Sequence, residues 1–434
     1  MVNVSNPRLT EYAFAVFSLL LFSGGYWHLL AAPNTHELER SALLLIRSIF
    51  ISVYAISLLL LLPRWRQALR AAVTEKSVVT LGLLAMLSTM WSDLPVDTFR
   101  SGIALLGTTL FGVYLGVSFR ASEQVALLFF ATSIAAMSSF AVTFMYPDYG
   151  LMQTSHVGAW RGIYPHKNML GFVMVLGLLS AYLLSNQQER YRFLTGTMFG
   201  LFLVMLMLTV SKASLGHAVM LSILLLGVAI HIRRSDLAVV GVITLTLAGA
   251  SLVGHLAAYC EPGMPSALTR TGTCDSDTNS VQSLRGFTGR TDLWAIAMER
   301  IEKRPLTGYG FYATWKHSKE FNEELQEREI NWDPDHAHNG YLDLLLNLGI
   351  LGMVVFLAGF SRNTVNAVRR ARRGCSWIAF WPILFLGLLV IVNLLESALV
   401  VQNNIAWVLY VAISVDLHMR RKNLKTQDIR SLRN

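Results

Sequence analysis

The feature that most constrains this chain is a series of apolar runs, each about as long as a membrane-crossing helix. Such a helix takes roughly 20 consecutive apolar residues. Twelve runs meet or approach that length, at residues 12–30, 42–62, 78–91, 103–119, 125–146, 169–184, 194–210, 215–232, 237–259, 342–360, 377–399 and 405–417. They predict an all-α polytopic membrane protein with about twelve transmembrane helices.

The composition excludes an ordinary soluble domain. Hydrophobic residues make up 53% of the 434 residues and charged residues only 15%, whereas soluble domains usually contain about 25% charged residues. The first apolar run follows a single basic residue, Arg8, and no clear cleavage site for a signal peptide follows it. We therefore expect this run to remain as a transmembrane helix.

The net charge of +9 could indicate a nucleic-acid partner, so the positions of the basic residues matter. If the N-terminus is cytoplasmic, 21 of the 36 Lys and Arg residues fall in cytoplasmic segments, and the short outer turn at 400–404 has none. The positive-inside rule describes this distribution. We therefore predict that both termini are cytoplasmic and that no nucleic acid is bound.

The longest hydrophilic segment is then expected on the outer side of the membrane. It divides the chain into four predicted parts: helices one to nine with short loops (1–259), a catalytic loop (260–341), helices ten to twelve (342–417) and a basic cytoplasmic tail (418–434).

The long loop has helical signals of its own. Thr291 can cap the segment TDLWAIAMERIEKR, which Pro305 and Gly308 would end. A second polar amphipathic stretch, KEFNEELQERE, follows it. Cys260 and Cys274 lie in the same loop, and in an oxidising compartment they could form a disulfide that closes about 14 residues.

Arg290 stands directly before the predicted loop helix. Its guanidinium and the unpaired N–H groups of the first helical turn could converge on one anion, such as a phosphate. The alternative is that Arg290 pairs with a neighbouring acid such as Asp292 or Glu299, since most loop arginines are solvated.

Further basic residues lie on the outer side or in the outer halves of helices. They are Arg40, Arg47, Arg100, Arg161, Lys167 and Lys212. Ionisable groups at membrane depth are costly, so they are candidates for function. Arg47 lies about five residues into an apolar run and could instead extend to the interface. Lys212, in the tight turn SKAS, has less freedom to do so.

Two polar clusters precede apolar runs. In WRGIYPHKNMLG, Arg161, His166 and Lys167 stand close to Asn168, which is a candidate helix cap. In DPDHAHNGYLD, two histidines lie two residues apart, at 336 and 338.

His336 and His338 would face the same way in an extended segment and could bind a metal together with Asp333 or Asp335. No further ligands are clustered at the spacing of a known metal site. Histidine beside a carboxylate and near arginines suits acid–base chemistry, so we favour that role and expect no metal.

Four motifs together resemble the O-antigen ligase and Wzy-type polysaccharide polymerase family over about residues 150–360. They are WRGIYPHKNMLG, SKAS, TGRTDLWAIAMERIEKRPLTGYGFYATW and HAHNGYLDLLLNLGILG, in the order that the family has them. The resemblance implies a GT-C-like helical fold in the bacterial inner membrane. It also implies an inverting glycosyltransferase that takes a glycan from undecaprenyl pyrophosphate on the periplasmic face, with neither metal nor other cofactor.

The resemblance implies roles for individual residues. His338 would be the catalytic base and Arg290 the essential loop arginine. The donor pyrophosphate would be bound by Lys212, Arg161, Lys167 and Arg47, with His336, Asn339 and His166 in support. The S-K form of the turn and the PHKN string are more similar to the polymerase branch of the family than to the ligases.

The acceptor depends on that branch. A polymerase, which we favour, would extend another lipid-linked repeat of O-antigen or exopolysaccharide and could work with a chain-length regulator. An O-antigen ligase would transfer the glycan to lipid A core. The alternative from another class is a twelve-helix transporter or flippase, but transporters usually show two related halves with broken helices at the midplane. Here the ionisable residues gather at the outer face.

Overall fold

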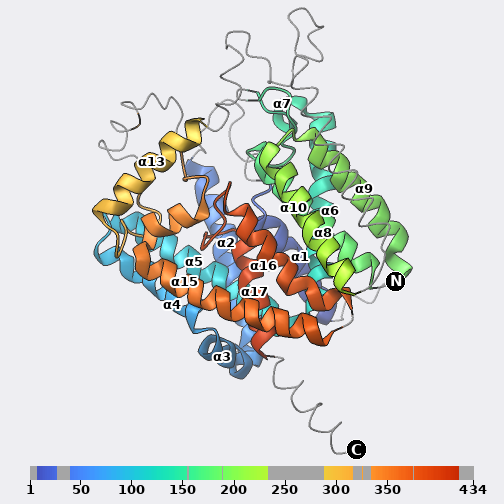
Figure 1. Ribbon diagram of the computed structural model, residues 1–434, viewed down its shortest axis with the longest axis horizontal. Helices are drawn as coiled ribbons and strands as arrows, with labels where there is room; N and C mark the ends of the chain where they lie inside the picture. The colour runs from blue at the N-terminus through green and yellow to red at the C-terminus, as the bar shows by residue number, and fades with distance from the viewer. Residues whose placement is uncertain are drawn as a thin grey trace, which may run out of the picture. The chain divides into compact units, whose positions relative to one another are not determined.

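The computed structural model describes residues 7–26, 40–153, 156–187, 189–232, 288–315, 325, 334–374 and 376–419. Within these ranges the chain is helical and contains no β-strand, only an isolated antiparallel bridge between Leu151 and Trp160. The α-helices are α1 Pro7–Phe22, α2 Arg40–Leu61, α3 Trp65–Thr74, α4 Lys76–Leu87, α5 Pro95–Ser118, α6 Ala121–Met145, α7 Pro147–Gly150, α8 Lys167–Ser185, α9 Arg192–Leu208, α10 Lys212–His231, α13 Thr288–Lys303, α15 Gly340–Arg373, α16 Trp381–Val392 and α17 Ile405–Met419 (Figure 1). The predicted all-α class is confirmed.

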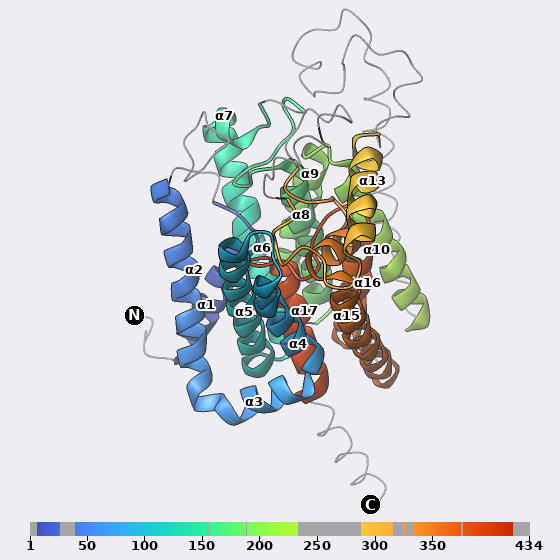
Figure 2. The same ribbon diagram turned by 90° about the vertical axis from the view of Figure 1, so that its left-hand side faces the viewer.

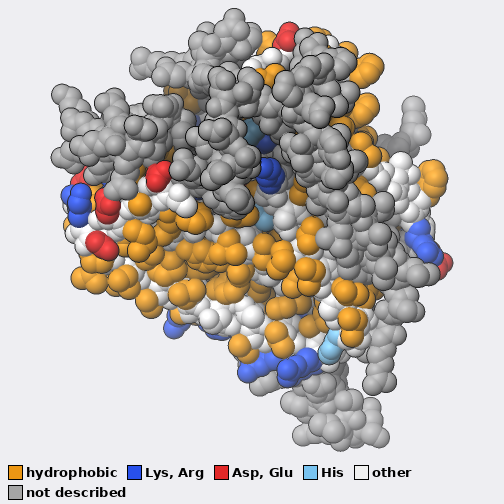
Figure 3. All heavy atoms as spheres, turned by 45° about the horizontal axis from the view of Figure 1, so that its top comes forward, with side chains coloured by type: hydrophobic (Ala, Val, Ile, Leu, Met, Phe, Trp, Pro, Cys, Tyr) orange, Lys and Arg blue, Asp and Glu red, His pale blue; other side chains and the backbone are white. Residues whose placement is uncertain are grey.

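The described helices have the lengths and surfaces of membrane spans. Seven segments are long and apolar enough to cross a membrane, namely Ala42–Thr74, Pro95–Ser118, Ala121–Met145, Lys167–Ser185, Glu189–Leu208, Lys212–His231 and Gly340–Arg373. Three shorter apolar helices accompany them. Large apolar side chains such as Leu44, Ile51 and Leu59 on α2 are exposed, and Figure 3 shows hydrophobic side chains over much of the described surface on the face in view. Such a surface suits a lipid environment.

A polytopic membrane protein is thus confirmed, but the predicted count of twelve spans is not. The predicted span 237–259 lies outside the described residues. The first helix, predicted at 12–30, runs instead from Pro7 to Phe22. It ends where Gly24 takes a left-handed backbone conformation with φ 84°, which glycine adopts without steric cost.

The chain forms two compact units. The first consists of residues 1–49, 119–277 and 371–388, and the second of 50–118, 278–370 and 389–434. Helices α2, α15 and α16 have residues in both. The four parts predicted from the sequence follow the order of the membrane spans along the chain and not the contacts between helices. They stay a prediction.

In the first unit, α8 is the central helix. Its residues from Leu170 to Leu184 are almost all buried, in contact with α6, α9 and α10, while α1 packs on α6. Phe129 on α6 meets Phe202 on α9 edge to face, with ring centroids 6.4 Å apart. These contacts explain why the run is apolar on all sides instead of along one stripe.

In the second unit, α17 lies along α5 (Figure 1). A Cβ atom at Gly112 would stand 3.0 Å from the carbonyl oxygen of Val408, and one at Gly116 would stand 2.7 Å from that of Ala412. Small residues at these points let the two backbones approach closely, as is common between membrane helices. Figure 2 shows α3 running across the ends of α4 and α5.

The segment that follows α13 is hydrogen-bonded into α15. Gly349 breaks α15 with φ 62° and ψ −164°, and a Cβ atom there would lie 2.3 Å from the carbonyl of Leu306. At this break the N–H of Ile350 donates to the carbonyl of Pro305 at 2.8 Å, and that of Tyr309 donates to Leu346 at 2.8 Å. The first glycine of LGILG, Gly349, is therefore needed for the segment after α13 to pack against α15.

Helix α13 confirms the predicted loop helix, although it begins at Thr288 and not at Thr291. Its predicted apolar face is buried in a small core that consists of Leu293, Ile296, Ala297, Ile301, Tyr309, Trp315, Leu325, Ala337 and Leu346. The stretch KEFNEELQERE lies outside the described residues except for Leu325, and so do Cys260 and Cys274.

Candidate active site

The two histidines of HAHNG lie in a tight turn at the start of α15. Asn339 caps this helix, because its Oδ1 accepts the N–H groups of Tyr341 at 3.0 Å and Leu342 at 3.3 Å. His338 has a left-handed backbone conformation, with φ 49°, and its N–H donates to Nδ1 of His336 at 3.2 Å. A non-glycine residue in this conformation is strained, a condition often found at functional sites.

The turn after α16 closes against this segment. The N–H of Gly340 donates to the carbonyls of Asn393 at 3.0 Å and Glu396 at 3.2 Å. A Cβ atom at Gly340 would lie 2.0 Å from Oδ1 of Asn393, so no side chain fits there. The same Oδ1 accepts the N–H of Ala398 at 2.7 Å.

The predicted span 377–399 is therefore too long. A 3-10 turn at Trp377–Phe380 leads into α16, which ends at Val392. The side chain of Asn393 caps the turn that follows and offers the backbone an alternative to helix. This leaves Glu396 outside the helix.

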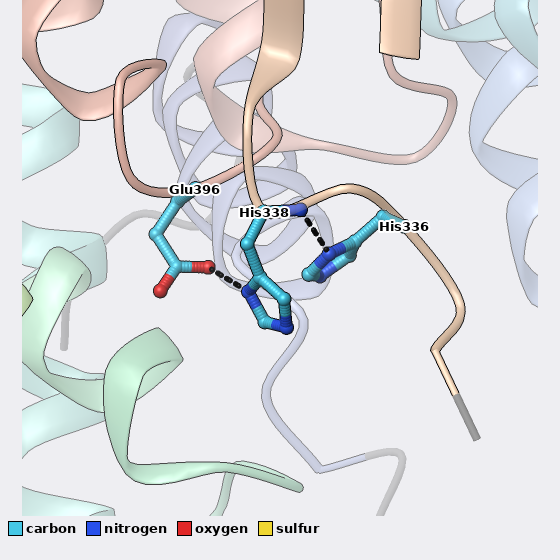
Figure 4. Close-up of side chains that lie close together, drawn as sticks. All are labelled: His336, His338 and Glu396. Carbon is cyan, nitrogen blue, oxygen red and sulfur yellow. Dashed lines mark hydrogen bonds and ion pairs between the residues drawn. The ribbon is translucent and has the colours of Figure 1, made fainter. Parts of the chain in front are cut away.

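Glu396 brings the two predicted catalytic residues together. Its Oε2 lies 3.4 Å from Nδ1 of His338, and its Oε1 lies 3.6 Å from Nη2 of Arg290. Figure 4 shows the carboxylate directed at the His338 ring, with His336 on the other side of that ring. Side-chain exposure is 23% for Arg290, 20% for His338 and 18% for Glu396, so all three are sheltered yet accessible.

The charges of this group favour an ionised Glu396. Burial raises the pKa of Glu396, but the hydrogen bond with His338 and the charges of His338, His336 and Arg290 outweigh burial and hold it below its ordinary value. Arg290 is the third residue of α13, not the residue before the helix as predicted. It pairs with Glu396 instead of Asp292 or Glu299, the neighbours considered as alternatives.

Asp343, whose buried carboxyl group lies on α15, holds the segment His336–His338 in place through hydrogen bonds. It accepts Nε1–H of Trp315 at 2.6 Å and the N–H of Ala337 at 3.1 Å, and it is also hydrogen-bonded to the hydroxyl of Ser397. Nε1–H of Trp294 donates to the carbonyl of Ala337 at 2.8 Å. The peptide between the two histidines is thus bound on both sides.

Replacing Asp343 by alanine should destabilise this region. The buried donors of Trp315 and Ala337 would lose their acceptor, at about 1–3 kcal/mol for each unsatisfied group. We expect a lower thermal unfolding temperature in detergent and faster proteolysis near residue 337. Asp335→Ala is the control, because the Asp335 side chain is 89% exposed and its loss should change neither measurement. Equal stability of both variants would contradict the role assigned to Asp343.

The hydrogen bonds also indicate the tautomers of the two rings. Nδ1 of His336 accepts an N–H, so it carries no proton, and its Nε2 lies 3.5 Å from Oδ1 of Asp335. Nδ1 of His338 faces a carboxylate and therefore carries the proton. In this tautomer Nε2 of His338 has the lone pair that a general base needs.

A metal could in principle use part of this group. One ligand atom from each of His336, His338 and Glu396 lies within 4.8 Å of the other two. The third member is thus Glu396 and not Asp335, and Asp333 lies outside the described residues. The guanidinium of Arg290 beside the same carboxylate disfavours a cation there, and Nδ1 of His336 is already an acceptor. Acid–base use fits these contacts better.

A second cluster lies in the first unit, where two long helices begin with lysine. Lys167 is the first residue of α8 and Lys212 the first of α10. Nζ of Lys167 donates to the carbonyl of Val210 at 3.2 Å, and Oγ of Ser211 donates to Oδ1 of Asn168 at 2.8 Å. The two helix starts are therefore held side by side.

This cluster has the character of an anion site. Burial, followed by the charges of Lys167 and Lys212, lowers the pKa of His156. Neither lysine pairs with a carboxylate within the described part of the chain. Two helix N-termini with two lysines match the requirements of a phosphate group.

Other predicted residues of this set have different surroundings. His166, not Asn168, caps α8, since its Nδ1 accepts the N–H of Asn168 at 3.2 Å. Arg161 donates to the carbonyl of Tyr149 at 2.9 Å and thereby holds the turn after α7; burial lowers the pKa of its guanidinium.

Arg47 is exposed on α2, and no described contact joins it to the two lysines. Lys167, Lys212, Arg161 and Arg47 belong to the first unit, whereas His338 and Arg290 belong to the second.

Sequence reasoning missed Glu396 and Asp343. Glu396 could have been identified from the sequence, because it is an acidic residue inside the predicted span 377–399 and ionisable residues in spans are candidates for function. Nothing local marks Asp343 as the residue that binds Trp315 and Ala337.

Comparisons with known proteins agree with the motif resemblance. Residues 197–357 match the family model described as O-antigen ligase. Two proteins of similar sequence are both named "Putative polysaccharide ligase": one from Rickettsia felis, 36% identical over 75 residues, and one from Rickettsia typhi, 35% identical over 71 residues. Each match covers 16% of this chain and 17% of the length of the relative. The matched family segment includes Lys212, Arg290 and His338.

Proposed function

We propose that this chain, whose residues 197–357 match the O-antigen ligase family, transfers a glycan from undecaprenyl pyrophosphate to an acceptor sugar. The reaction would take place on the periplasmic face of the bacterial inner membrane, with both termini of the chain in the cytoplasm. The observation that supports this most is the group formed by His338, Glu396 and Arg290, in which a base and a guanidinium share one carboxylate.

His338 would act as the general base. Its Nε2 takes the proton of the acceptor hydroxyl while that oxygen attacks the anomeric carbon of the donor sugar. The bond between this carbon and the pyrophosphate oxygen breaks, and undecaprenyl pyrophosphate leaves with the electron pair. Attack from the face opposite the leaving group inverts the anomeric configuration.

Arg290 would stabilise the charge that develops on the leaving pyrophosphate. It stands in the first turn of α13, where N–H groups without helical partners also point toward the start of the helix. Hydrogen-bond donors that are already fixed where negative charge develops lower the activation barrier most effectively in a site sheltered from water. On this account the leaving group needs neither metal nor cofactor, and a chelator should leave the rate unchanged.

Lys212 and Lys167 would bind the donor pyrophosphate in the ground state. We expect Lys212→Ala to raise the KM for the lipid donor about tenfold or more, the usual effect of losing a charge-assisted hydrogen bond. The KM for the acceptor should change little. Initial rates measured against each substrate in turn separate the two effects.

Lys76→Ala is the matched control, because Lys76 is likewise the first residue of a helix, α4, but is predicted on the cytoplasmic side. A similar rise in both KM values for Lys212→Ala would count against a pyrophosphate role.

The type of acceptor decides between two activities. We favour polymerisation of lipid-linked repeats, because of the S-K turn and the PHKN string, whereas the names of the two relatives favour a ligase. Purified protein given the lipid-linked repeat alone should produce a ladder of glycan lengths if it is a polymerase. A reaction that starts only after lipid A core is added would identify a ligase. Movement of the lipid across vesicles with no glycan transfer would indicate a flippase and overturn the proposal.

A further inference from the structure

We propose that Glu396 is a positioning residue that couples donor binding to the base. One oxygen would hold His338 in the tautomer with a proton on Nδ1. The other would restrain Arg290 until the pyrophosphate of the donor takes its place. This inference rests on the proposed glycan transfer and adds to it a residue that the matched family segment, which ends at 357, does not contain.

The geometry supports a shared carboxylate. The two partners use different oxygens, at 3.4 Å for His338 and 3.6 Å for Arg290. Both separations exceed the usual 2.7–3.2 Å of an N–H···O bond, so neither contact is tight and each partner can still move closer or away. Catalytic hydrogen bonds are often long without substrate and shorten when it binds.

The backbone around Glu396 is held in place, which is what a positioning role requires. The carbonyl of Glu396 accepts the N–H of Gly340 at 3.2 Å, two residues after His338. The next residue, Ser397, is hydrogen-bonded to the buried Asp343, which also binds Ala337. Glu396 and the histidine segment are therefore fixed to the same support. The lowered pKa of Glu396 keeps its charge at neutral pH.

A donor pyrophosphate would change the balance of this group. It bears more negative charge than one carboxylate and offers bidentate oxygens to a guanidinium. Once Arg290 turns to the donor, the charge of Glu396 is no longer shared with the guanidinium and stabilises more strongly the imidazolium that forms when His338 takes a proton. His338 would thus be most basic only when the donor is bound.

This coupling predicts two effects of opposite direction for Glu396→Gln, which keeps the shape and removes the charge. Turnover at saturating donor should fall about 10- to 100-fold, the usual loss when the partner that orients a functional histidine is removed. Binding of undecaprenyl pyrophosphate should become about two- to fivefold tighter, because Arg290 no longer has a competing ion pair. A residue with only a structural role would weaken both binding and turnover.

The test uses the purified full-length protein in detergent. The dissociation constant for undecaprenyl pyrophosphate and the initial rate of glycan transfer are measured for the wild type, Glu396→Gln, Glu396→Asp, His338→Ala and the double variant His338→Ala/Glu396→Gln. Glu396→Asp keeps the charge on a shorter side chain and should restore part of the turnover. Glu302→Gln, at an exposed acid on the same helix as Arg290, should match the wild type in both measurements.

The double variant is the sharpest comparison. If Glu396 acts through His338, the double variant should transfer glycan no more slowly than the single variant His338→Ala, since the effects of two residues in one catalytic unit do not add. The inference would be overturned if Glu396→Gln had the turnover of the wild type or bound pyrophosphate more weakly. A further additive loss of transfer in the double variant would also overturn it. If the wild type transfers no glycan at all, the proposed function itself fails; if it transfers while Glu396→Gln is normal, only the coupling fails.

Discussion

Replacing His338 by alanine is expected to slow glycan transfer by about 10²- to 10⁴-fold, the range that general base catalysis contributes. Without the imidazole, the acceptor hydroxyl would have to lose its proton to water as it attacks. The side chain is 20% exposed and lies outside the buried core, so the variant should fold and reach the membrane at normal levels. Transfer rates of the purified protein, together with its thermal unfolding temperature, check both parts.

His231→Ala is a suitable control for that experiment. His231 is an exposed residue at the last turn of α10, where its ring contacts Phe380, and it has no part in the proposed reaction. Its replacement should leave transfer unchanged. Normal product from a well-folded His338→Ala variant would rule out His338 as the base, whatever the behaviour of the control.

Arg290→Ala is expected to reduce turnover by about 10²- to 10³-fold, which is the usual cost of removing one donor from a developing negative charge. Because this charge grows mainly in the transition state, kcat should fall more than the donor KM rises. Arg290→Lys keeps the charge but loses the planar fork that binds two oxygens, so it should recover only part of the rate. Steady-state kinetics with the lipid-linked donor measure all of these changes.

Arg304→Ala provides the matched control for Arg290. It removes a second guanidinium just past the other end of α13, where Arg304 forms an exposed ion pair with Asp93 at 2.7 Å. Exposed pairs contribute at most about 1 kcal/mol, so little loss of turnover is expected. If both arginine variants lost activity equally, the effect would come from the charge of the loop as a whole and not from the position of Arg290.

The sequence by itself determined the class of the protein and pointed to most of the residues of the candidate site. Apolar runs near the length of a bilayer crossing leave helices as the only regular structure, because every backbone polar group must then be paired within its own segment. The helix α13 also followed from local signals, since the spacing of Leu293, Ile296 and Ile301 identifies its buried face. Arg290 was singled out as an arginine at a helix start, His338 as a histidine beside carboxylates and Lys212 as a cation in a tight outer turn, and the family resemblance implied their roles.

Only the tertiary structure decided how these residues are joined. The carboxylate that links His338 to Arg290 comes from Glu396, 58 residues after the histidine, and its position depends on where α16 ends. The support under the histidines depends in the same way on Asp343, and the docking of the loop on the break at Gly349. Apolar patterning states which side of a helix is buried but not which distant turn it meets. For that reason the sequence predicted a base and an arginine, and the fold supplied the acid between them.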